Sequence, residues 1–135
     1  MNKPRVLIVD DNAINVELAA FVLDAGGFEV DSAADAGRAL ACIEVATPDV
    51  ILMDIQMPGV DGLALTRRLK SDPSTRRIVV VAFTAYAMKG DEARMRAAGC
   101  DGYLAKPIDV TRFAAQVRAC LDDARRGDAD PVGAP

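Results

Sequence analysis

The sequence predicts an α/β fold in which a five-stranded parallel sheet carries helices on both faces, as a three-layer sandwich. Three observations support this prediction. Short, almost wholly apolar runs recur along the chain, and such runs are typical of strands that are covered on both faces. Stretches with the period of a helix separate these runs. Strand and helix thus alternate five times, which favours a parallel sheet with right-handed crossovers.

Five segments are expected to form the strands. Four of them are apolar throughout or nearly so, whereas residues 28–33 alternate apolar and polar side chains and fit an edge strand with one wetter face. In chain order, the predicted strands are residues 6–9, 28–33, 50–53, 78–83 and 103–105.

A helix is expected after each strand. Asp35 and Asp109 are candidate N-caps, and Gly26 and Gly99 mark the ends of two helices. The predicted helices are residues 14–25, 36–43, 63–69, 88–98 and 110–121. In the first helix, apolar residues at helical spacing share the face that we expect to be buried: Ile14, Leu18, Phe21, Val22 and Ala25.

Length and composition fit one globular domain with a real core. The chain has 135 residues, 27% of them charged, and a formal net charge of -4. An acidic domain is a poor candidate for direct nucleic-acid binding, because phosphate contacts need a basic surface. No apolar run is long enough for membrane insertion. We expect residues 1–124 to form the domain and residues 125–135 a flexible tail rich in Pro, Gly, Ala and Asp.

The chain has no histidine and three cysteines, Cys42, Cys100 and Cys120. The lack of histidine excludes His-dependent catalytic triads and His metal sites, which leaves carboxylates as the candidate reactive groups. The spacing of the cysteines fits no metal or redox motif. We therefore expect reduced, partly buried thiols in a cytoplasmic protein.

Chemically complementary residues follow four of the five predicted strands. In chain order they are Asp10-Asp11, Asp54, Thr84-Ala85 and Lys106-Pro107. In open parallel sheets the ligand site lies outside the carboxyl ends of the strands. We therefore expect three carboxylates, one hydroxyl and one ammonium to meet at one edge of the sheet.

The three carboxylates predict a metal site. Like charges at close range raise one another's pKa values unless a cation lies between them. A hard divalent ion such as Mg²⁺ fits, because it prefers oxygen ligands and keeps several waters. Asp10, Asp11 and Asp54 would supply carboxylates, and Gln56 its backbone carbonyl. Mn²⁺ is the alternative ion.

Other phosphate and nucleotide sites fit less well. The sequence has neither a GxxxxGK[ST] loop nor a GxGxxG turn after the first strand. A flavin phosphate would meet Asp10 and Asp11, which repel it, where a hydroxyl- and glycine-rich loop is needed. A Mg²⁺-dependent phosphatase with Asp54 as nucleophile usually has a second Asp two residues later, where this chain has Gln56. That enzyme is the less favoured alternative.

These motifs resemble the receiver domains of bacterial response regulators over residues 4–122. The resemblance rests on VDDN at 9–12, LMDIQMPGVDG at 52–62, TA at 84–85 and KP at 106–107. It implies a CheY-like, flavodoxin-like (βα)5 fold whose strands lie in the order 2-1-3-4-5.

The resemblance also implies a role for the residues at the strand ends. Asp54 corresponds to the phosphoacceptor, and Asp10 and Asp11 to the acidic pair that holds Mg²⁺. Lys106 corresponds to the cation that pairs with the acceptor or its phosphoryl oxygens. Pro107 corresponds to a proline that usually follows a cis peptide bond.

Four further positions are implied to bind the phosphoryl group or to respond to it. Thr84, with Ala85, corresponds to the hydroxyl that follows the phosphoryl group on activation. Tyr103 corresponds to an aromatic residue whose inward or outward position reports the state. Gln56 and Tyr86 lie where such domains vary, so we expect them to tune the lifetime of the acyl phosphate, with Tyr86 shielding it from water.

The implied function is that of a two-component phosphorelay receiver. It would take a phosphoryl group from a histidine kinase or a histidine phosphotransfer protein, and its only catalysis would be its own phosphorylation and dephosphorylation. Added charge would switch protein binding on the face formed by residues 88–98, 103–105 and 109–121. The expected target is a downstream kinase or an adaptor protein, and the expected assembly is a monomer or weak dimer.

A finer resemblance is to single-domain regulators of the DivK type, carried by TAYAMKGDE at 84–92 and by Asp11, Asn12 and Asn15. Receivers attached to hybrid histidine kinases look similar. We expect a stand-alone regulator, because Met1 leads directly into the first strand, with an excised receiver module as the alternative. The first helix near Ile14 and Asn15 is a candidate docking face for the phosphodonor, although burial of Ile14 in the core is an equally simple interpretation.

Overall fold

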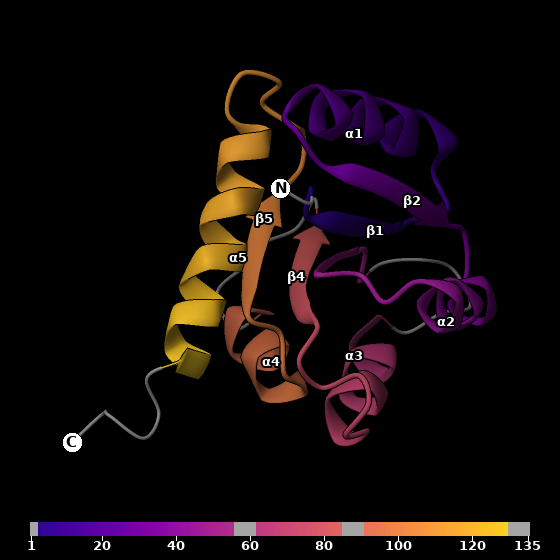
Figure 1. Cartoon of the computed structure of the whole chain (residues 1–135), viewed down its shortest axis with the longest axis vertical. Helices are drawn as coiled ribbons and strands as arrows, with labels where there is room; N and C mark the ends of the chain where they lie inside the picture. Colours follow the sequence, from indigo (N-terminus) through magenta and orange to yellow (C-terminus); the bar gives the residue numbers. More distant parts are fainter. Residues whose placement is uncertain (1–2, 56–61, 85–90, 130–135) are drawn as a thin grey trace.

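A computed structural model describes residues 3–55, 62–84 and 91–129. Its centre is a parallel sheet in the order β2-β1-β3-β4-β5, which confirms the predicted fold class and strand order (Figure 1). The strands are β1 (Arg5–Val9), β2 (Glu29–Ala33), β3 (Val50–Met53), β4 (Val79–Thr84) and β5 (Gly102–Ala105).

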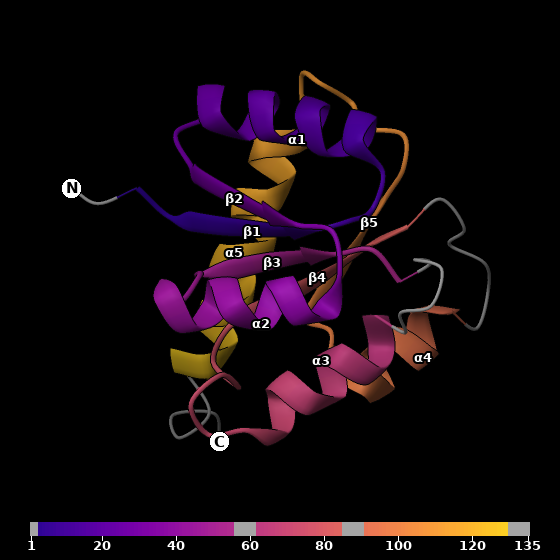
Figure 2. The same cartoon turned by 90° about the vertical axis from the view of Figure 1, so that its right-hand side faces the viewer.

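Helices cover both faces of this sheet. They are α1 (Ala13–Ala25), α2 (Ala36–Val45), α3 (Gly62–Ser71), α4 (Asp91–Ala98) and α5 (Phe113–Ala129). As Figures 1 and 2 show, α1 and α5 lie on one face, and α2, α3 and α4 lie on the other. No helix in the described ranges is long and apolar enough to cross a bilayer.

Alternation along the strands divides the core into two layers. Val79, Val81 and Phe83 of β4 pack with residues of α1 and α5. Val80 and Ala82, on the opposite face of the same strand, pack with residues of α2, α3 and α4. The three central strands are therefore buried on both faces, which explains why they read as continuous apolar runs.

The edge strand β2 is more exposed than the central strands. Only Ala33 of this strand is buried. Its outward side chains meet Arg5 of β1, whose guanidinium lies 2.9 Å from Glu29 and 3.5 Å from Asp31. Charged side chains on an exposed edge discourage pairing with another chain. The alternating pattern of residues 28–33 was thus read correctly as an edge strand.

The predicted buried face of α1 was wrong. Ile14 and Phe21 are 77% and 74% exposed, and Leu18 is 40% exposed. Ala19 and Leu23 are buried instead. The helix carries apolar residues around most of its circumference, so periodicity alone does not select a face.

The end of α1 lies close against α5. A Cβ on Gly26, the residue that ends α1, would lie 2.5 Å from the Cβ of Ala114. This approach is open only to glycine. The end of α1 thus lies against α5, and Leu23 is buried in the apolar cluster that these two helices share.

The chain end also differs from the expected tail. α5 continues to Ala129, so residues 125–129 are helical, and residues 130–135 lie outside the described part. Arg125 forms an ion pair with Asp49 beside the start of β3, and Arg126 lies 3.3 Å from Asp123 on the helix itself. These ion pairs supply contacts that composition alone does not reveal.

The start of α5 is later than predicted. Asp109 caps a turn that precedes the helix, accepting hydrogen bonds from the backbone N–H and hydroxyl of Thr111 at 3.1 and 2.7 Å. These bonds hold the pKa of Asp109 below its ordinary value. The helix itself begins at Phe113.

The three cysteines carry free thiols. Cys100 is buried under α4, and burial raises its pKa, as it does for Cys120. A raised pKa lowers the fraction of reactive thiolate at neutral pH. This state agrees with the expected structural, unpaired cysteines.

The corrected orientation of α1 predicts unequal costs for two truncations. Leu23→Ala should lower the free energy of unfolding by about 2–5 kcal/mol, because it opens a cavity in the core. Phe21→Ala should change it by less than about 0.5 kcal/mol, because that ring is exposed. Urea unfolding followed by circular dichroism measures both values. Equal costs, or a larger cost for Phe21→Ala, would show that α1 packs on the other face.

Candidate functional site

Parallel pairing brings the acidic residues together at the carboxyl edge of the sheet. The backbone N–H of Asp10 donates to the carbonyl of Ala33 at 3.1 Å, and that of Asp54 donates to the carbonyl of Val9 at 2.9 Å. These bonds extend the sheet one residue past β1 and β3. As a result, carboxylate oxygens of Asp10, Asp11 and Asp54 lie within 4.8 Å of one another.

Two of these carboxylates are withdrawn from solvent. The side chains of Asp10 and Asp54 are 1% and 8% exposed, whereas Asp11 is exposed. A buried carboxylate needs a cation or hydrogen bonds to remain ionised at low cost. Asp10 has both, because its Oδ1 accepts from the backbone N–H of Asn12 at 2.9 Å and its Oδ2 faces Lys106.

Lys106 is the cation of the site. Its Nζ lies 3.0 Å from Oδ2 of Asp10 and 3.4 Å from Oδ2 of Asp54. The backbone places it there, since the N–H of Lys106 donates to the carbonyl of Thr84 at 2.8 Å and extends the pairing of β4 with β5. The peptide bond to Pro107 is cis.

The turn after β1 holds Asp11 beside the buried pair. Asn12 caps α1, and its Oδ1 accepts from the backbone N–H groups of Ile14 and Asn15 at 3.0 and 3.1 Å. This cap fixes the chain between strand and helix. Sequence reasoning placed Asn12 in a motif but did not assign it this role.

Gly62 also supports the site in a way that the sequence did not reveal. A Cβ at this position would lie 2.6 Å from the carbonyl oxygen of Asp54 and 2.9 Å from Cα of Ile55. Only glycine permits α3 to start this close to the backbone of the candidate acceptor. A glycine directly before an apolar helical stretch was the available signal.

Thr84 and Tyr103 lie on the same face of the sheet. Tyr103 pairs with Ala82 in the register of β4 and β5, and Thr84 stands two residues after Ala82, so all three share the face that α4 covers. Thr84 is buried, while Tyr103 is 37% exposed. Of the other predicted site residues, Gln56, Ala85 and Tyr86 lie outside the described part of the chain.

The donor set fits a hard divalent cation. Its members offer only carboxylate oxygen, which is the donor type that Mg²⁺ prefers. Among the residues that the structure describes, three carboxylates and one ammonium meet here, and their formal charges sum to minus two, which a divalent ion would balance. Asp10, Asp11 and Asp54 are therefore the residues that would hold it.

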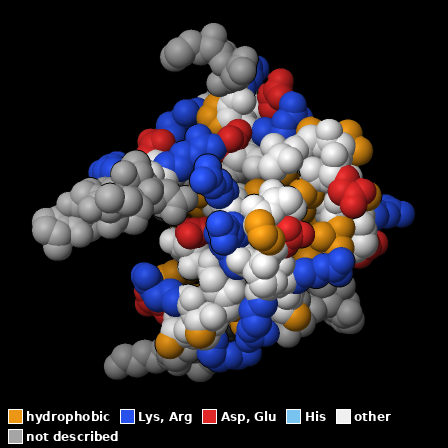
Figure 3. All heavy atoms as spheres, turned by 60° about the horizontal axis from the view of Figure 1, so that its bottom comes forward, with side chains coloured by type: hydrophobic (Ala, Val, Ile, Leu, Met, Phe, Trp, Pro, Cys, Tyr) orange, Lys and Arg blue, Asp and Glu red, His pale blue; other side chains and the backbone are white. Residues whose placement is uncertain are grey.

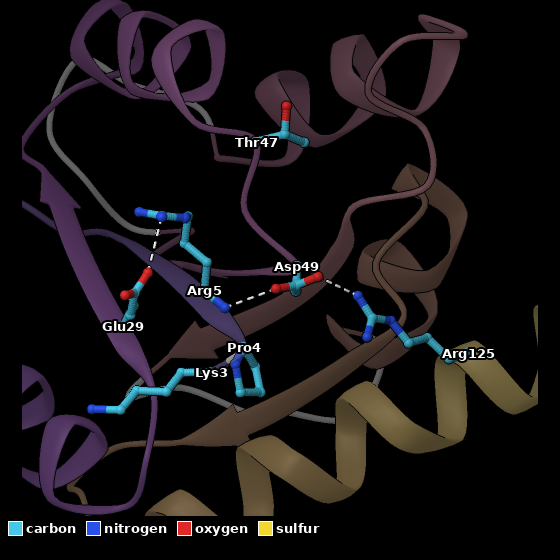
Figure 4. Close-up of a pocket in the computed structure, with 7 residues that line it drawn as sticks. All are labelled: Lys3, Pro4, Arg5, Glu29, Thr47, Asp49 and Arg125. Atoms are coloured by element: carbon cyan, nitrogen blue, oxygen red, sulfur yellow. Dashed lines mark hydrogen bonds and ion pairs between the residues drawn. The ribbon is translucent and has the colours of Figure 1, made fainter. Parts of the chain in front are cut away.

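A second polar region lies at the opposite end of the strands. A pocket of about 620 Å³ there is lined by Lys3, Pro4, Arg5, Glu29, Thr47, Asp49 and Arg125 (Figure 4). Four of its charged side chains are paired with one another or with backbone, since Arg5 reaches Glu29, and Asp49 meets both the backbone N–H of Arg5 and the side chain of Arg125. These ion pairs and hydrogen bonds connect β1 to β2, to the start of β3 and, through Asp49, to α5.

The face of the molecule below α3 and α4 in Figure 1 carries side chains of both charges. Figure 3 turns the underside of Figure 1 forward and shows Lys and Arg side chains interspersed with acidic and apolar ones. The formal net charge of the chain is -4.

Comparison with known proteins gives a consistent result. The family described as "Response regulator receiver domain" matches residues 6–118. The polar-differentiation response regulator DivK of Brucella anthropi is 45% identical over 119 residues, which cover 88% of this chain and 97% of DivK.

Solved structures agree with these sequence matches. The chemotaxis response regulator CheY4 of Vibrio cholerae has a TM-score of 0.82 at 25% identity, covering 88% of this chain and 99% of CheY4. NtrX of Brucella abortus has a TM-score of 0.84 at 27% identity, covering 96% of this chain but 30% of NtrX. The same fold thus occurs alone and within a longer chain.

The proposed metal ligands predict a selective loss of binding. Asp11→Asn should weaken Mg²⁺ binding at least about tenfold, equivalent to about 1.4 kcal/mol, because it removes the one exposed carboxylate of the cluster without opening the core. Isothermal titration calorimetry measures this affinity. Asp24→Asn, an exposed acid on α1, is the control and should bind Mg²⁺ like the wild type. Equal affinity in all three proteins would place the metal elsewhere.

Proposed function

The chain belongs to the response regulator receiver domain family, and we propose that it is a phosphorylation switch whose acceptor is the carboxylate of Asp54. Receiver domains are signalling modules of two-component systems rather than enzymes that act on external substrates. Magnesium binding and phosphorylation are typical of the family. The observation that carries the proposal is that the buried carboxylate of Asp54 lies close both to the acidic pair Asp10 and Asp11 and to the ammonium of Lys106.

The geometry suits in-line phosphoryl transfer. An oxygen of Asp54 attacks phosphorus, the bond from phosphorus to the donor breaks, and the donor group leaves with the bonding electron pair. Lys106, 3.4 Å from that carboxylate, neutralises charge on the incoming phosphoryl oxygens. A divalent cation held by Asp10, Asp11 and Asp54 would neutralise further charge there.

The product would act through its added negative charge and its acceptor oxygens. We propose that Thr84, with Ala85, donates to the phosphoryl group and that Tyr103 responds. Thr84 and Tyr103 share a face of the sheet, and Thr84 is buried beside a half-exposed ring. Binding would then switch on the surface formed by α4, β5 and α5. Phosphorylation can shift the equilibrium between the inactive and active conformations only as far as the phosphoryl group favours one of them over the other.

The proposed donor is a histidine kinase or a histidine phosphotransfer protein, docked on α1. The exposed stripe of Ile14, Leu18 and Phe21 supports this surface, because it starts beside the acidic cluster. The proposed target is a downstream kinase or adaptor protein, bound by a cytoplasmic monomer or weak dimer. A stand-alone regulator is favoured by the coverage of DivK, and a module of a longer protein, as in NtrX, is the alternative.

Phosphorylation of Asp54 is directly testable. Acetyl phosphate with Mg²⁺ should add one phosphoryl group to the wild-type protein, releasing acetate, whereas Asp54→Asn should add none. Intact-protein mass spectrometry measures both products. Asp101→Asn, which changes an aspartate at the far end of β5, is the control and should be phosphorylated. Equal modification of the wild type and Asp54→Asn would overturn the assignment.

A second prediction concerns the lifetime of the acyl phosphate. We expect Tyr86→Ala to speed dephosphorylation, because the aromatic ring would no longer shield the site from water. Phe21→Ala, which removes an exposed ring from α1, should leave the rate unchanged. Loss of the phosphorylated mass after removal of acetyl phosphate gives the rate. An unchanged rate in Tyr86→Ala would end the proposed role of this tyrosine.

A further inference from the structure

A buried aromatic ring lies beneath the ammonium of the site. Nζ of Lys106 is 5.2 Å from the centroid of the Phe83 ring. Phe83 is 1% exposed and stands directly before Thr84, on the opposite face of β4. An ammonium within about 6 Å of a ring centroid is attracted by the negative face of the ring. The ring is therefore a third partner of Lys106, after Asp10 and Asp54.

The register of the sheet produces this contact. Phe83 pairs with Leu104 of β5, so both side chains point to the layer that holds α1 and α5. Lys106 follows Leu104 by two residues and, through its backbone bond to Thr84, continues the same alternation. Lys106 and Phe83 thus lie on the same face of the sheet, which places the ammonium near the ring.

The ring itself is held from α5. Its centroid lies 5.4 Å from that of Phe113, the first residue of α5, and the two ring planes are tilted by 36°. Both rings are almost completely buried in one apolar cluster. Phe83 therefore presents a fixed surface to the ammonium.

We propose that Phe83 is a positioning residue that holds the ammonium of Lys106 between Asp10 and Asp54, and that it thereby sets how strongly this lysine competes with a divalent cation. The inference rests on the proposed function of the acidic cluster. The side chain of Lys106 is 15% exposed, so little water screens its attraction to the ring. At such sites the attraction corresponds to about a three- to tenfold change in an equilibrium constant.

Removing the ring should change Mg²⁺ affinity and phosphorylation rate in opposite directions. Without the ring, Lys106 is held less firmly against Asp10, so Mg²⁺ meets less competition and binds more tightly. The same loosened ammonium is placed less well to neutralise an incoming phosphoryl group, so phosphorylation at saturating Mg²⁺ slows. Simple damage to the fold would instead weaken both metal binding and phosphorylation.

Two substitutions at the ring test this inference. Phe83→Leu removes the ring and keeps an apolar side chain, and Phe83→trifluorophenylalanine keeps the shape but removes the negative ring face. Both should bind Mg²⁺ about three- to tenfold more tightly by calorimetry and react more slowly with acetyl phosphate at saturating Mg²⁺. Phe28→Leu, which removes a buried ring of the same apolar cluster that faces Arg118 rather than Lys106, is the control and should leave Mg²⁺ affinity unchanged.

A double-mutant cycle shows whether the ring acts through the lysine. In a Lys106→Met background, Phe83→Leu should have no further effect on Mg²⁺ affinity. An effect that persists there, or a fall in both affinity and rate in the fluorinated variant, would overturn the positioning role. Unchanged values in both Phe83 variants would do the same. A wild-type protein that neither binds Mg²⁺ nor accepts phosphate would instead overturn the proposed function itself, and this inference with it.

Discussion

The structure depends on how charge is balanced at the carboxyl edge of a parallel sheet. Two aspartates are buried there and a third stands at the rim, with one lysine between the buried pair. Leaving a buried carboxylate without a partner is costly, and in the described part of the chain a single ammonium faces three carboxylates. The remaining charge suits the edge for a divalent cation and for phosphoryl chemistry, because both need oxygen donors and a fixed cation in a largely dry site.

Residues outside the acidic cluster hold its carboxylates and the ammonium of Lys106 in place through close contacts. Gly62 lets α3 begin against the backbone of Asp54, and Asn12 fixes the turn that carries Asp11. On the other face of the sheet, Phe83 and Phe113 link the ammonium of Lys106 to α5. The edge that carries the acidic cluster and the proposed binding surface therefore share elements, and in the proposed switch a change in charge at the first would alter the packing of the second.

Topology explains which features could be predicted from the sequence. Asp10, Asp54 and Lys106 follow apolar strands, and parallel pairing must bring such residues to one edge. The exposed face of α1 could not be predicted, because Ile14 and Leu23 are both apolar and the packing of α1 against α5, with its close approach at Gly26, is not visible in the sequence. The role of Phe83 was hidden for a similar reason, since in a buried strand its ring looks like any other core side chain.

The proposed switch requires that the acyl phosphate forms on Asp54 and on no other carboxylate of the cluster. Borohydride reduction of the phosphorylated protein converts the modified aspartate to homoserine, and tandem mass spectrometry of its peptides locates that residue. We predict homoserine at position 54 only. Homoserine at position 10 or 11 would contradict the proposed switch, because the acceptor would then be a residue to which we assign metal binding alone.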